Sequence, residues 1–452
     1  MLFNSKDFIL YFLPVVFVLY HLSPPRFRLL VICLASFFFY FTSGAVPAIF
    51  MLASIGWAYV CALVFQRREH HAGHVAIAAA FPLAVLFMFR YLGFTLETTG
   101  LTNYSHYFDF FLFVAVPAGI SFYTFQIVSY SVDVYDGTIP AERNLTKLAA
   151  YISFFPQLIA GPILRYDQIS AQFDRISTQR WVPIDIIMAT RLIAFGLFFK
   201  VFVADMFGVY QDAHQRIADP TALDNLYLIA CYSLRIYFDF WAYSTIAIGL
   251  GKLFGIDLPR NFREPYLSKN PKEFWRRWHI TLSYWIRDYL YLRIGGNEHY
   301  IRNIIIVFAA CGLWHGAGWN FVIWGLYHAA LIVAYTLFQR VWDTWPGALQ
   351  VFLTFVLVSM GWPLFFLDVS AYLGVVTSFT DPSAWSSTSF NARAWILLSL
   401  VMAFIFIFRE DKWLFQPSGF YKITMNPFLH SVIIFACLIF TSWERTFIYF
   451  RF

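Results

Sequence analysis

Long apolar runs, separated by short polar connections, dominate the pattern of this chain. Most of the runs extend for roughly 15 to 25 residues, which is the length that a helix needs to cross a bilayer. The runs do not alternate apolar and polar residues at a period of two, as membrane β-barrel strands do. We therefore expect an all-α integral membrane protein with about 11 to 13 membrane-inserted helices. The predicted segments are 8–22, 27–43, 45–66, 75–92, 110–132, 148–164, 186–210, 224–254, 303–320, 321–340, 349–367, 394–409 and 428–448.

Two segments are not expected to cross the bilayer as regular helices. The run PQLIAGP, from Pro156 to Pro162, interrupts segment 148–164 with two prolines and a glycine. Broken backbone at membrane depth is tolerated only inside protein or along a cavity, so we expect a re-entrant or kinked element there. Segment 279–293 is too short and too polar to span, which favours an interfacial or half-inserted helix. The connections are short, and residues 1–452 are predicted to form a single membrane-embedded domain.

Composition supports lipid as the solvent for much of this surface. Hydrophobic residues make up 60% of the chain and charged residues 13%, against roughly 45–50% and 25% in soluble domains. This balance excludes a soluble globular protein. Five cysteines lie in or beside apolar runs at spacings that indicate small core residues rather than disulfides or a metal site, and they are Cys33, Cys61, Cys231, Cys311 and Cys437.

The positive charge of the chain is concentrated in one window. Residues 260–302 contain nine Lys or Arg and four acidic residues, so they carry +5 of the net charge of +6. One interpretation is topology alone, because loops rich in Lys and Arg stay in the cytoplasm. The other is a cytoplasmic mouth that attracts an anionic ligand such as the phosphates of a nucleotide-like cofactor. No nucleic-acid partner is expected.

A histidine between glycines, in the run GLWHGAG from Gly312 to Gly318, is the first candidate for chemistry. An ionisable side chain at membrane depth is costly, so His315 is a functional candidate by default. Glycines at 312, 316 and 318 remove side chains around it and let a helix or a ligand approach closely. Burial favours the neutral imidazole, which can accept a proton as a general base. The alternative is a hydrogen-bonded core histidine. His328, at the end of the same segment, has a weaker claim.

The second candidate is His279, at the end of the run WRRWH. On a continuous helix Trp275, Trp278 and His279 share one stripe, while Arg276 and Arg277 point elsewhere. Glu273 precedes Arg277 by four residues, which is a favourable order for an ion pair. The alternative is an aromatic anchor with snorkelling arginines at the membrane interface, although this does not explain the histidine.

Three further residues carry weaker signals. Cys311 precedes His315 by four residues, so the two share a helix face and could carry a thioester, although a buried cysteine is more often inert. Arg235 and Asp239 are also four apart and can pair on one face. We interpret that pair as structural, with a transport role as the alternative. No metal site is predicted.

Three runs stand out together: EFWRRWHITLSYWIRDYLY (273–291), GGN (295–297) and GLWHGAGWNFVIWGLYH (312–328). They resemble the membrane-bound O-acyltransferase family, in its bacterial branch for alginate O-acetylation and teichoic acid D-alanyl transfer. Further similar runs are PAGISFYTFQ (117–126), FPQLIAGP (155–162), YFDF (237–240), YSTIAIGLG (243–251) and FIYFRF (447–452). One departure is WPLFFLD (362–368), where that branch often has W-x-x-F-R-A, and this leaves the polymer and the partner open.

The resemblance implies an acyltransferase of the bacterial inner membrane, with helices arranged around a central funnel. It implies that His315 is catalytic and that His279 is a second functional histidine. The expected donor is cytoplasmic acetyl-CoA, with no permanently bound cofactor, and the expected product is an O-acetylated secreted polysaccharide. Candidate donor-binding residues are Trp275, Arg276, Arg277, Trp278, Trp314 and Asn320. Expected partners are a periplasmic esterase-like acetyltransferase, a polysaccharide synthase or secretion complex and the lipid bilayer. D-alanyl transfer, peptidoglycan O-acyl transfer and a transporter or flippase without acyltransferase activity are the alternatives.

Overall fold

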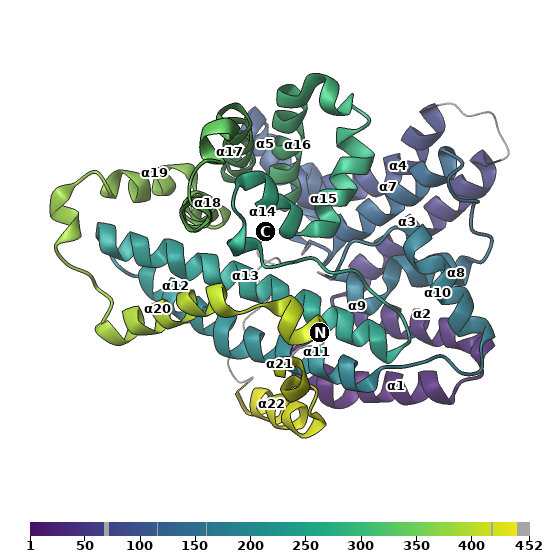
Figure 1. Cartoon of the computed structure of the whole chain (residues 1–452). Helices are drawn as coiled ribbons and strands as arrows, with labels where there is room; N and C mark the ends of the chain where they lie inside the picture. Colours follow the sequence, from purple (N-terminus) through teal and green to yellow (C-terminus); the bar gives the residue numbers. More distant parts are fainter. Residues whose placement is uncertain (67–71, 115, 160, 417–418, 441–452) are drawn as a thin grey trace. The chain divides into compact units, whose positions relative to one another are not determined.

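The computed structural model describes residues 1–66, 72–114, 116–159, 161–416 and 419–440. Throughout these residues the chain forms helices joined by loops, with no β-strand (Figure 1). The all-α prediction is confirmed. The chain divides into two compact units, the first of Met1–Ile193 with Ser244–Pro259 and the second of Ala194–Tyr243 with Arg260–Phe452. The prediction of a single membrane-embedded domain stays a prediction.

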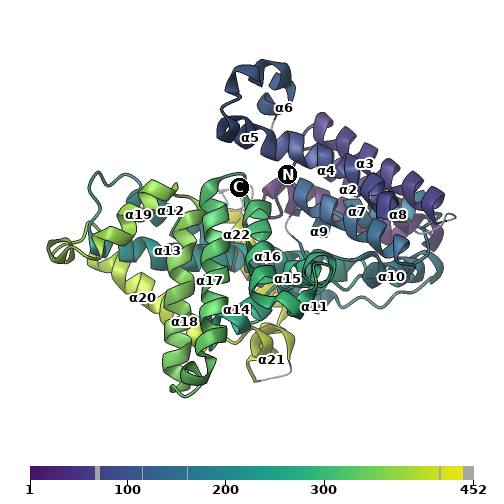
Figure 2. The ribbon, with the colours of Figure 1, turned by 90° about the horizontal axis from the view of Figure 1, so that it is seen from above.

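The first unit is built from the N-terminal helices. Among them α3, α4 and α7 pack against one another, and α2 packs against α8 and α10 (Figure 2). The helices are α1 Leu13–Leu22, α2 Pro25–Phe41, α3 Ala45–Phe65, α4 Ala72–Leu86, α5 Leu92–Thr99, α6 Asp109–Phe113, α7 Ile120–Tyr135, α8 Leu145–Ser153, α9 Phe155–Leu158 and α10 Tyr166–Thr178. Two helices, α11 (Ile186–Phe198) and α13 (Ala222–Leu253), contain residues of both units.

Two predicted spans of this unit are interrupted. The prediction of one helix over 110–132 is wrong, because α6 ends at Phe113 and α7 begins only at Ile120. Gly119 has a φ of +71°, and a Cβ there would lie 2.3 Å from the Leu158 carbonyl oxygen, so only glycine allows this turn. The break predicted in 148–164 is present, since α8 ends at Ser153 and α9 follows with Pro156 in its first turn. Its re-entrant character stays a prediction.

The second unit contains the histidine-bearing runs. Its helices are α12 Asp205–His214, α14 Pro271–Arg277, α15 Ile280–Ile286, α16 Tyr300–His315, α17 Trp319–Trp342, α18 Gly347–Gly361, α19 Val369–Ser378, α20 Ala392–Ile407, α21 Gly419–Thr424 and α22 Pro427–Phe440. Helices α16, α17 and α18 lie side by side (Figures 1 and 2). On α17, Phe321, Trp324 and His328 are buried on one face, whereas Leu337 and Phe338 are exposed, which is the apolar exterior expected of a helix in lipid.

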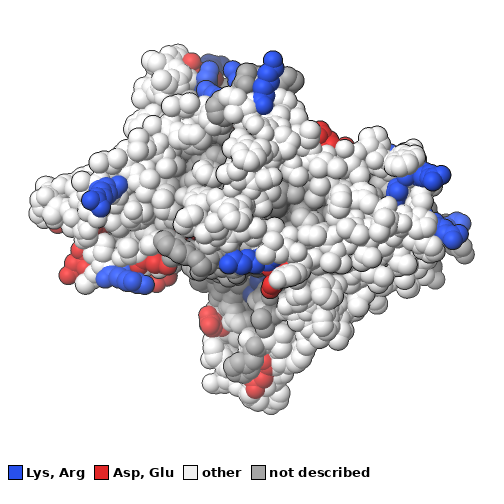
Figure 3. All heavy atoms as spheres, turned by 90° about the horizontal axis from the view of Figure 1, so that it is seen from below, with Lys and Arg blue, Asp and Glu red and all other residues white. Residues whose placement is uncertain are grey.

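Five continuous helical stretches are long and apolar enough to cross a membrane, and three of them join an α-helix to π- or 3-10-helical turns. They are Ala45–Phe65, Gly73–Thr99, Ile186–His214, Trp319–Trp342 and Gly347–Phe365. Shorter apolar helices are Phe8–Leu22, Val369–Ser378, Ala392–Ile407 and Pro427–Phe440. The face drawn in Figure 3 is mostly uncharged, with Lys, Arg, Asp and Glu in small groups. These helices support the predicted multi-pass membrane fold, whereas the number of 11 to 13 inserted helices and the central funnel stay predictions. The last predicted span continues beyond α22 to 448, and that part, with FIYFRF, lies outside the described residues.

The buried charges of α13 have partners on other segments. Asp239 forms an ion pair with Lys200 at 2.8 Å, and Lys200 also contacts Asp205 at 2.6 Å. Arg235 donates to the side-chain oxygen of Gln211. These partners come from other segments, beyond the reach of i to i+4 spacing, and the predicted Arg235–Asp239 pair itself stays a prediction.

Candidate active site

His279 lies at a sharp break between two helices. Helix α14 ends at Arg277, Trp278 is extended, and His279 has φ 43° and ψ 54° before α15 begins at Ile280. These angles belong to the left-handed region, which residues other than glycine rarely adopt. The predicted continuous stripe of Trp275, Trp278 and His279 is therefore wrong, since no single helix carries all three residues.

His315 is the last residue of α16. The backbone then runs extended through Gly316 and Gly318, and α17 starts at Trp319, so the predicted span 303–320 is shorter than expected. A Cβ on Gly312 would lie 2.2 Å from the Phe321 carbonyl oxygen, and one on Gly316 would lie 2.1 Å from the Phe321 ring. The close approach expected at these glycines is thus made by α17 of the same chain.

The two candidate histidines lie next to each other, although 35 residues separate them in the sequence. Their ring centroids are 6.5 Å apart, and the side chains are 0% and 2% exposed. Trp314 lies beside both rings, at 5.9 Å from His279 and 4.9 Å from His315. Phe240 covers His279 edge-on at 4.7 Å. The structure thus brings together two histidines that lie far apart in the sequence.

A third histidine is enclosed by tryptophans near this pair. His328 is fully buried, and its ring lies 5.1 Å from Trp275 and 4.8 Å from Trp324. Trp324 also lies 5.0 Å from the ring of His315. One indole therefore separates His315 from His328, and Trp275 connects this aromatic cluster to the pockets beyond it.

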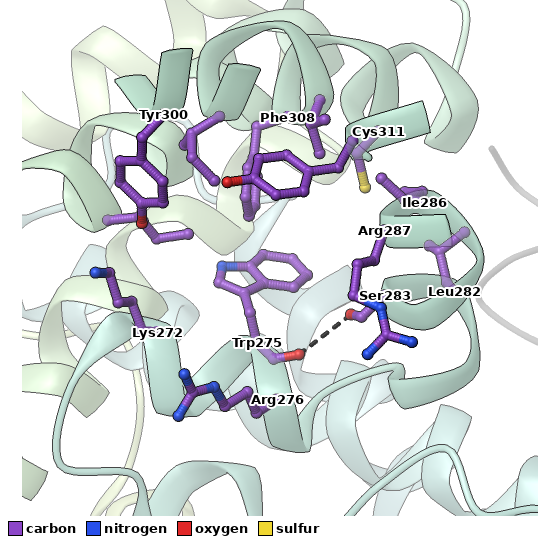
Figure 4. A pocket seen from close by; sticks show the side chains of 14 residues that line it. Lys272, Trp275, Arg276, Leu282, Ser283, Ile286, Arg287, Tyr300, Phe308 and Cys311 are labelled. Atoms are coloured by element: carbon purple, nitrogen blue, oxygen red, sulfur yellow. Dashed lines mark hydrogen bonds between the residues drawn. The ribbon is translucent and has the colours of Figure 1, made fainter. Parts of the chain in front are cut away.

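An apolar cavity of about 270 Å³ lies on the other side of Trp275 (Figure 4). Its walls come from α14, α15, α16 and α17, and the residues that close it include Leu282, Ile286, Phe308 and Cys311. Leu282 follows His279 by three residues and Cys311 precedes His315 by four, so the cavity lies about one helical turn from each histidine. Cys311 and His315 share a helix face as predicted, because α16 is helical across both.

The cavity adjoins a wider, basic pocket of about 710 Å³. Both are lined by Trp275, Arg276, Ser283 and Arg287. The Ser283 hydroxyl donates to the Trp275 carbonyl at 3.1 Å, which holds α15 against α14 (Figure 4). Arg277 also lines the wider pocket and pairs with Glu273 at 2.6 Å, as predicted. Arg276 is exposed and pairs with no carboxylate of the described residues.

Three of the candidate donor-binding residues lie away from both pockets. Trp278 is 1% exposed and packs in the core, 4.7 Å from Trp362 and 5.0 Å from Phe262. The Asn320 amide donates to the Leu364 carbonyl at 2.8 Å and so ties α17 to a neighbouring turn. Trp314 contacts the histidines rather than a pocket wall. These three residues belong to the motifs of the family resemblance, but none of them lines either pocket.

Several pocket residues did not stand out in the sequence. Lys272 and Arg287 place cations at the cavity, while Tyr300 and Phe308 form a wall from α16 (Figure 4). The concentration of charge in residues 260–302 was the signal for the two cations. Tyr300 and Phe308 carried none, because aromatic residues occur throughout the chain.

The arrangement offers two chemically distinct compartments. The basic pocket suits a phosphate-bearing ligand, because guanidinium groups bind phosphate oxygens through charge-assisted hydrogen bonds. The apolar cavity suits an uncharged chain attached to such a ligand. The buried imidazoles, one helical turn away, suit proton transfer in a site from which water is largely excluded.

Comparisons with known proteins agree with this description. A family model described as MBOAT, membrane-bound O-acyltransferase family, matches residues 82–345. A protein named probable alginate O-acetylase AlgI from Azotobacter vinelandii is 37% identical over 81% of this chain and 75% of its own. The peptidoglycan O-acetyltransferase of Helicobacter pylori is 32% identical over 81% of this chain and 77% of its own. The teichoic acid D-alanyltransferase of Bacillus subtilis is 31% identical over 55% of this chain and 68% of its own.

Proposed function

The chain belongs to the membrane-bound O-acyltransferase family, and from this premise we propose that it is an acetyltransferase of secreted polysaccharide. It is a multi-pass membrane O-acyltransferase. The alternative prediction of a transporter without acyltransferase activity is therefore wrong. In the proposed reaction an acetyl group leaves cytoplasmic acetyl-CoA and crosses the bacterial inner membrane to a hydroxyl group. The similarity to probable alginate O-acetylases over most of the chain supports this acceptor class.

The pair of buried imidazoles, 6.5 Å apart, is the observation that carries the proposal. His315 accepts the proton of the acceptor hydroxyl while its oxygen attacks the thioester carbonyl carbon. A carbon–oxygen bond forms and the carbon–sulfur bond breaks. The departing sulfur takes the proton back from His315 and leaves as the free thiol. His279 orients the donor or stabilises the charge that develops on the carbonyl oxygen.

The two pockets support acetyl-CoA as the donor. Its phosphates would bind Arg276 and Arg277 in the basic pocket, and the chain that carries the thioester would enter the apolar cavity beside Trp275. Leu282 and Cys311, each about one helical turn from one of the histidines, line the cavity, and we propose that the thioester end reaches the imidazoles from there. No covalent intermediate is required by this route, and Cys311 serves as part of the cavity wall.

We propose that the acetyl group reaches the polymer through a periplasmic esterase-like acetyltransferase that works with a synthase or secretion complex. The support is the short connections between helices, which offer little surface for a long polymer. D-alanyl transfer is less favoured, because the D-alanyltransferase similarity covers 55% of the chain. Peptidoglycan is the second candidate acceptor, supported by the similarity to a peptidoglycan O-acetyltransferase over 81% of the chain.

The test uses the purified full chain in lipid nanodiscs with labelled acetyl-CoA, a soluble glycan acceptor and a periplasmic extract that supplies the proposed partner. His315→Gln is expected to lower kcat by about 10²- to 10⁴-fold, the contribution of one positioned base. His214→Gln is the matched control, because His214 is a buried histidine of the same unit that contacts Asn225 at 3.0 Å, away from the proposed site. An unchanged rate in His315→Gln would contradict the proposal. Transfer from D-alanyl or other thioesters, without transfer from acetyl-CoA, would contradict the donor.

A further inference from the structure

Two residues other than glycine have a left-handed backbone in the described part of the chain. They are His279, with φ 43°, and Glu264, with φ 48°. Such strain persists only where the surroundings hold the backbone in place, and it often marks functional sites. Both residues belong to two short segments, 261–264 and 277–281, that bond to each other. The contacts of these segments therefore explain how His279 keeps its conformation.

Three hydrogen bonds fix the backbone on both sides of His279. The amide of Ile280 donates to the Asn261 carbonyl at 2.8 Å, and the amide of Arg263 donates to the Arg277 carbonyl at 3.0 Å. The hydroxyl of Thr281 donates to the Asn261 side-chain oxygen at 2.6 Å. Asn261 thus holds the two residues after His279 with its backbone and its side chain together.

The segment that contains Asn261 is itself anchored from another helix. Glu410 is 1% exposed, and one of its carboxylate oxygens accepts the amide of Glu264 at 2.9 Å. The other carboxylate oxygen accepts the indole of Trp241. Trp241 follows Phe240, the residue whose ring covers His279. Glu410 therefore joins segment 261–264 to α13, the helix whose Phe240 packs against the His279 ring.

We propose that Asn261 is a positioning residue for His279, and that Glu410 anchors it. Asn261 is 1% exposed and His279 is 0% exposed, so water cannot replace the hydrogen bonds that hold this segment. Without the bonds from Thr281 and Ile280, the backbone of His279 relaxes towards ordinary angles, and the imidazole turns away from His315. This inference rests on the proposed role of His279 in acyl transfer.

The experiment removes one bond of the clamp without changing the size of the side chain. Thr281→Val deletes the hydroxyl that donates to Asn261, and Thr281→Ser retains it. Thr354→Val is the matched control, because Thr354 is a buried threonine of α18 whose hydroxyl bonds only locally, to the Gln350 carbonyl at 2.7 Å. In the full chain in nanodiscs, kcat and KM for acetyl-CoA are measured, with thermal stability alongside.

Thr281→Val is expected to lower kcat by about three- to tenfold, the effect of one buried hydrogen bond, and to leave KM unchanged. Thr281→Ser and Thr354→Val are expected to keep the rate. The loss should disappear in a His279→Gln background, because the clamp then has no imidazole to position. A full rate in Thr281→Val, or an equal further loss in His279→Gln, would overturn the inference. A full rate in His279→Gln alone would instead overturn the proposed function of that histidine.

Discussion

A methyl group added at Gly325 tests whether the packing of α16 against α17 sets the position of His315. A Cβ at this residue would lie 2.1 Å from the Phe308 carbonyl oxygen on α16. Carbon and oxygen atoms rarely approach closer than about 3.3 Å, so the two helices must separate by about 1.2 Å (3.3 minus 2.1). The clash is with backbone, which cannot rotate away as a side chain can.

A separation of this size should affect catalysis more than folding. Overpacking typically lowers the free energy of unfolding by about 1–3 kcal/mol, so we expect Gly325→Ala to fold. A misplacement of about 1 Å at reacting groups lowers rates by about 10²-fold, so Gly325→Ala is expected to lower kcat by this factor. His315, which is seven residues after Phe308 on the same helix, moves with it.

The assay compares acetyl transfer by Gly325→Ala and Gly374→Ala in nanodiscs. Gly374 is a helical glycine of α19 with nothing within 4 Å of an added Cβ, so its alanine variant should keep the wild-type rate. Thermal unfolding of both variants shows whether the helices remain assembled. A wild-type kcat in Gly325→Ala, at normal protein yield, would refute the reasoning that this contact positions the histidine.

Three further predictions concern the two pockets and the buried carboxyl group of Glu410. Arg276→Gln should raise KM for acetyl-CoA by about tenfold, the value of one hydrogen bond to a charged group, whereas Arg340→Gln, on the exposed end of α17, should not; equal KM values would contradict the donor site. Cys311→Ala should retain activity, and the wild-type chain should carry no thioester-linked label at Cys311 after incubation with labelled acetyl-CoA, because Cys311 only lines the cavity; a labelled cysteine or an inactive variant would contradict this. Burial raises the pKa of Glu410 from 4.5 to about 7. The folded protein therefore binds the proton more tightly than the unfolded chain, and the free energy of unfolding should fall by up to about 3 kcal/mol as pH rises from 4.5 to 7. Glu410→Gln should flatten this pH dependence in thermal unfolding, and an unchanged dependence would contradict the prediction.

Helix formation was predictable because its cause is local. Within a bilayer every backbone group must bond inside the segment, so a long apolar run becomes a helix. This reasoning holds for 45–66, 186–210, 321–340 and 349–367, each of which corresponds closely to a long apolar helix. It fails at 110–132, where Pro117 and the left-handed Gly119 interrupt the run and the turn depends on contact with another segment.

The site was predictable in its residues more than in its geometry. The histidines stood out because an ionisable group in an apolar run demands an explanation, and the family resemblance indicated that both are functional. Their separation of 6.5 Å could not be derived from the sequence, because it depends on how α14, α15 and α16 pack. The break at His279 was also hidden, since the bonds that hold it come from Asn261, 18 residues earlier. The glycines near His315 predicted the close approach of a helix or a ligand, and Phe321 of α17 makes that approach.

The central claim is that His279 and His315 act together in acyl transfer, and a double-mutant cycle tests it most directly. The kcat for acetyl transfer is measured for His279→Gln, His315→Gln and the double variant, with His214→Gln as the control. Groups that act in one step are non-additive, so the double variant should be no slower than the slower single variant. Losses that multiply, or single variants that keep the wild-type rate, would contradict the account.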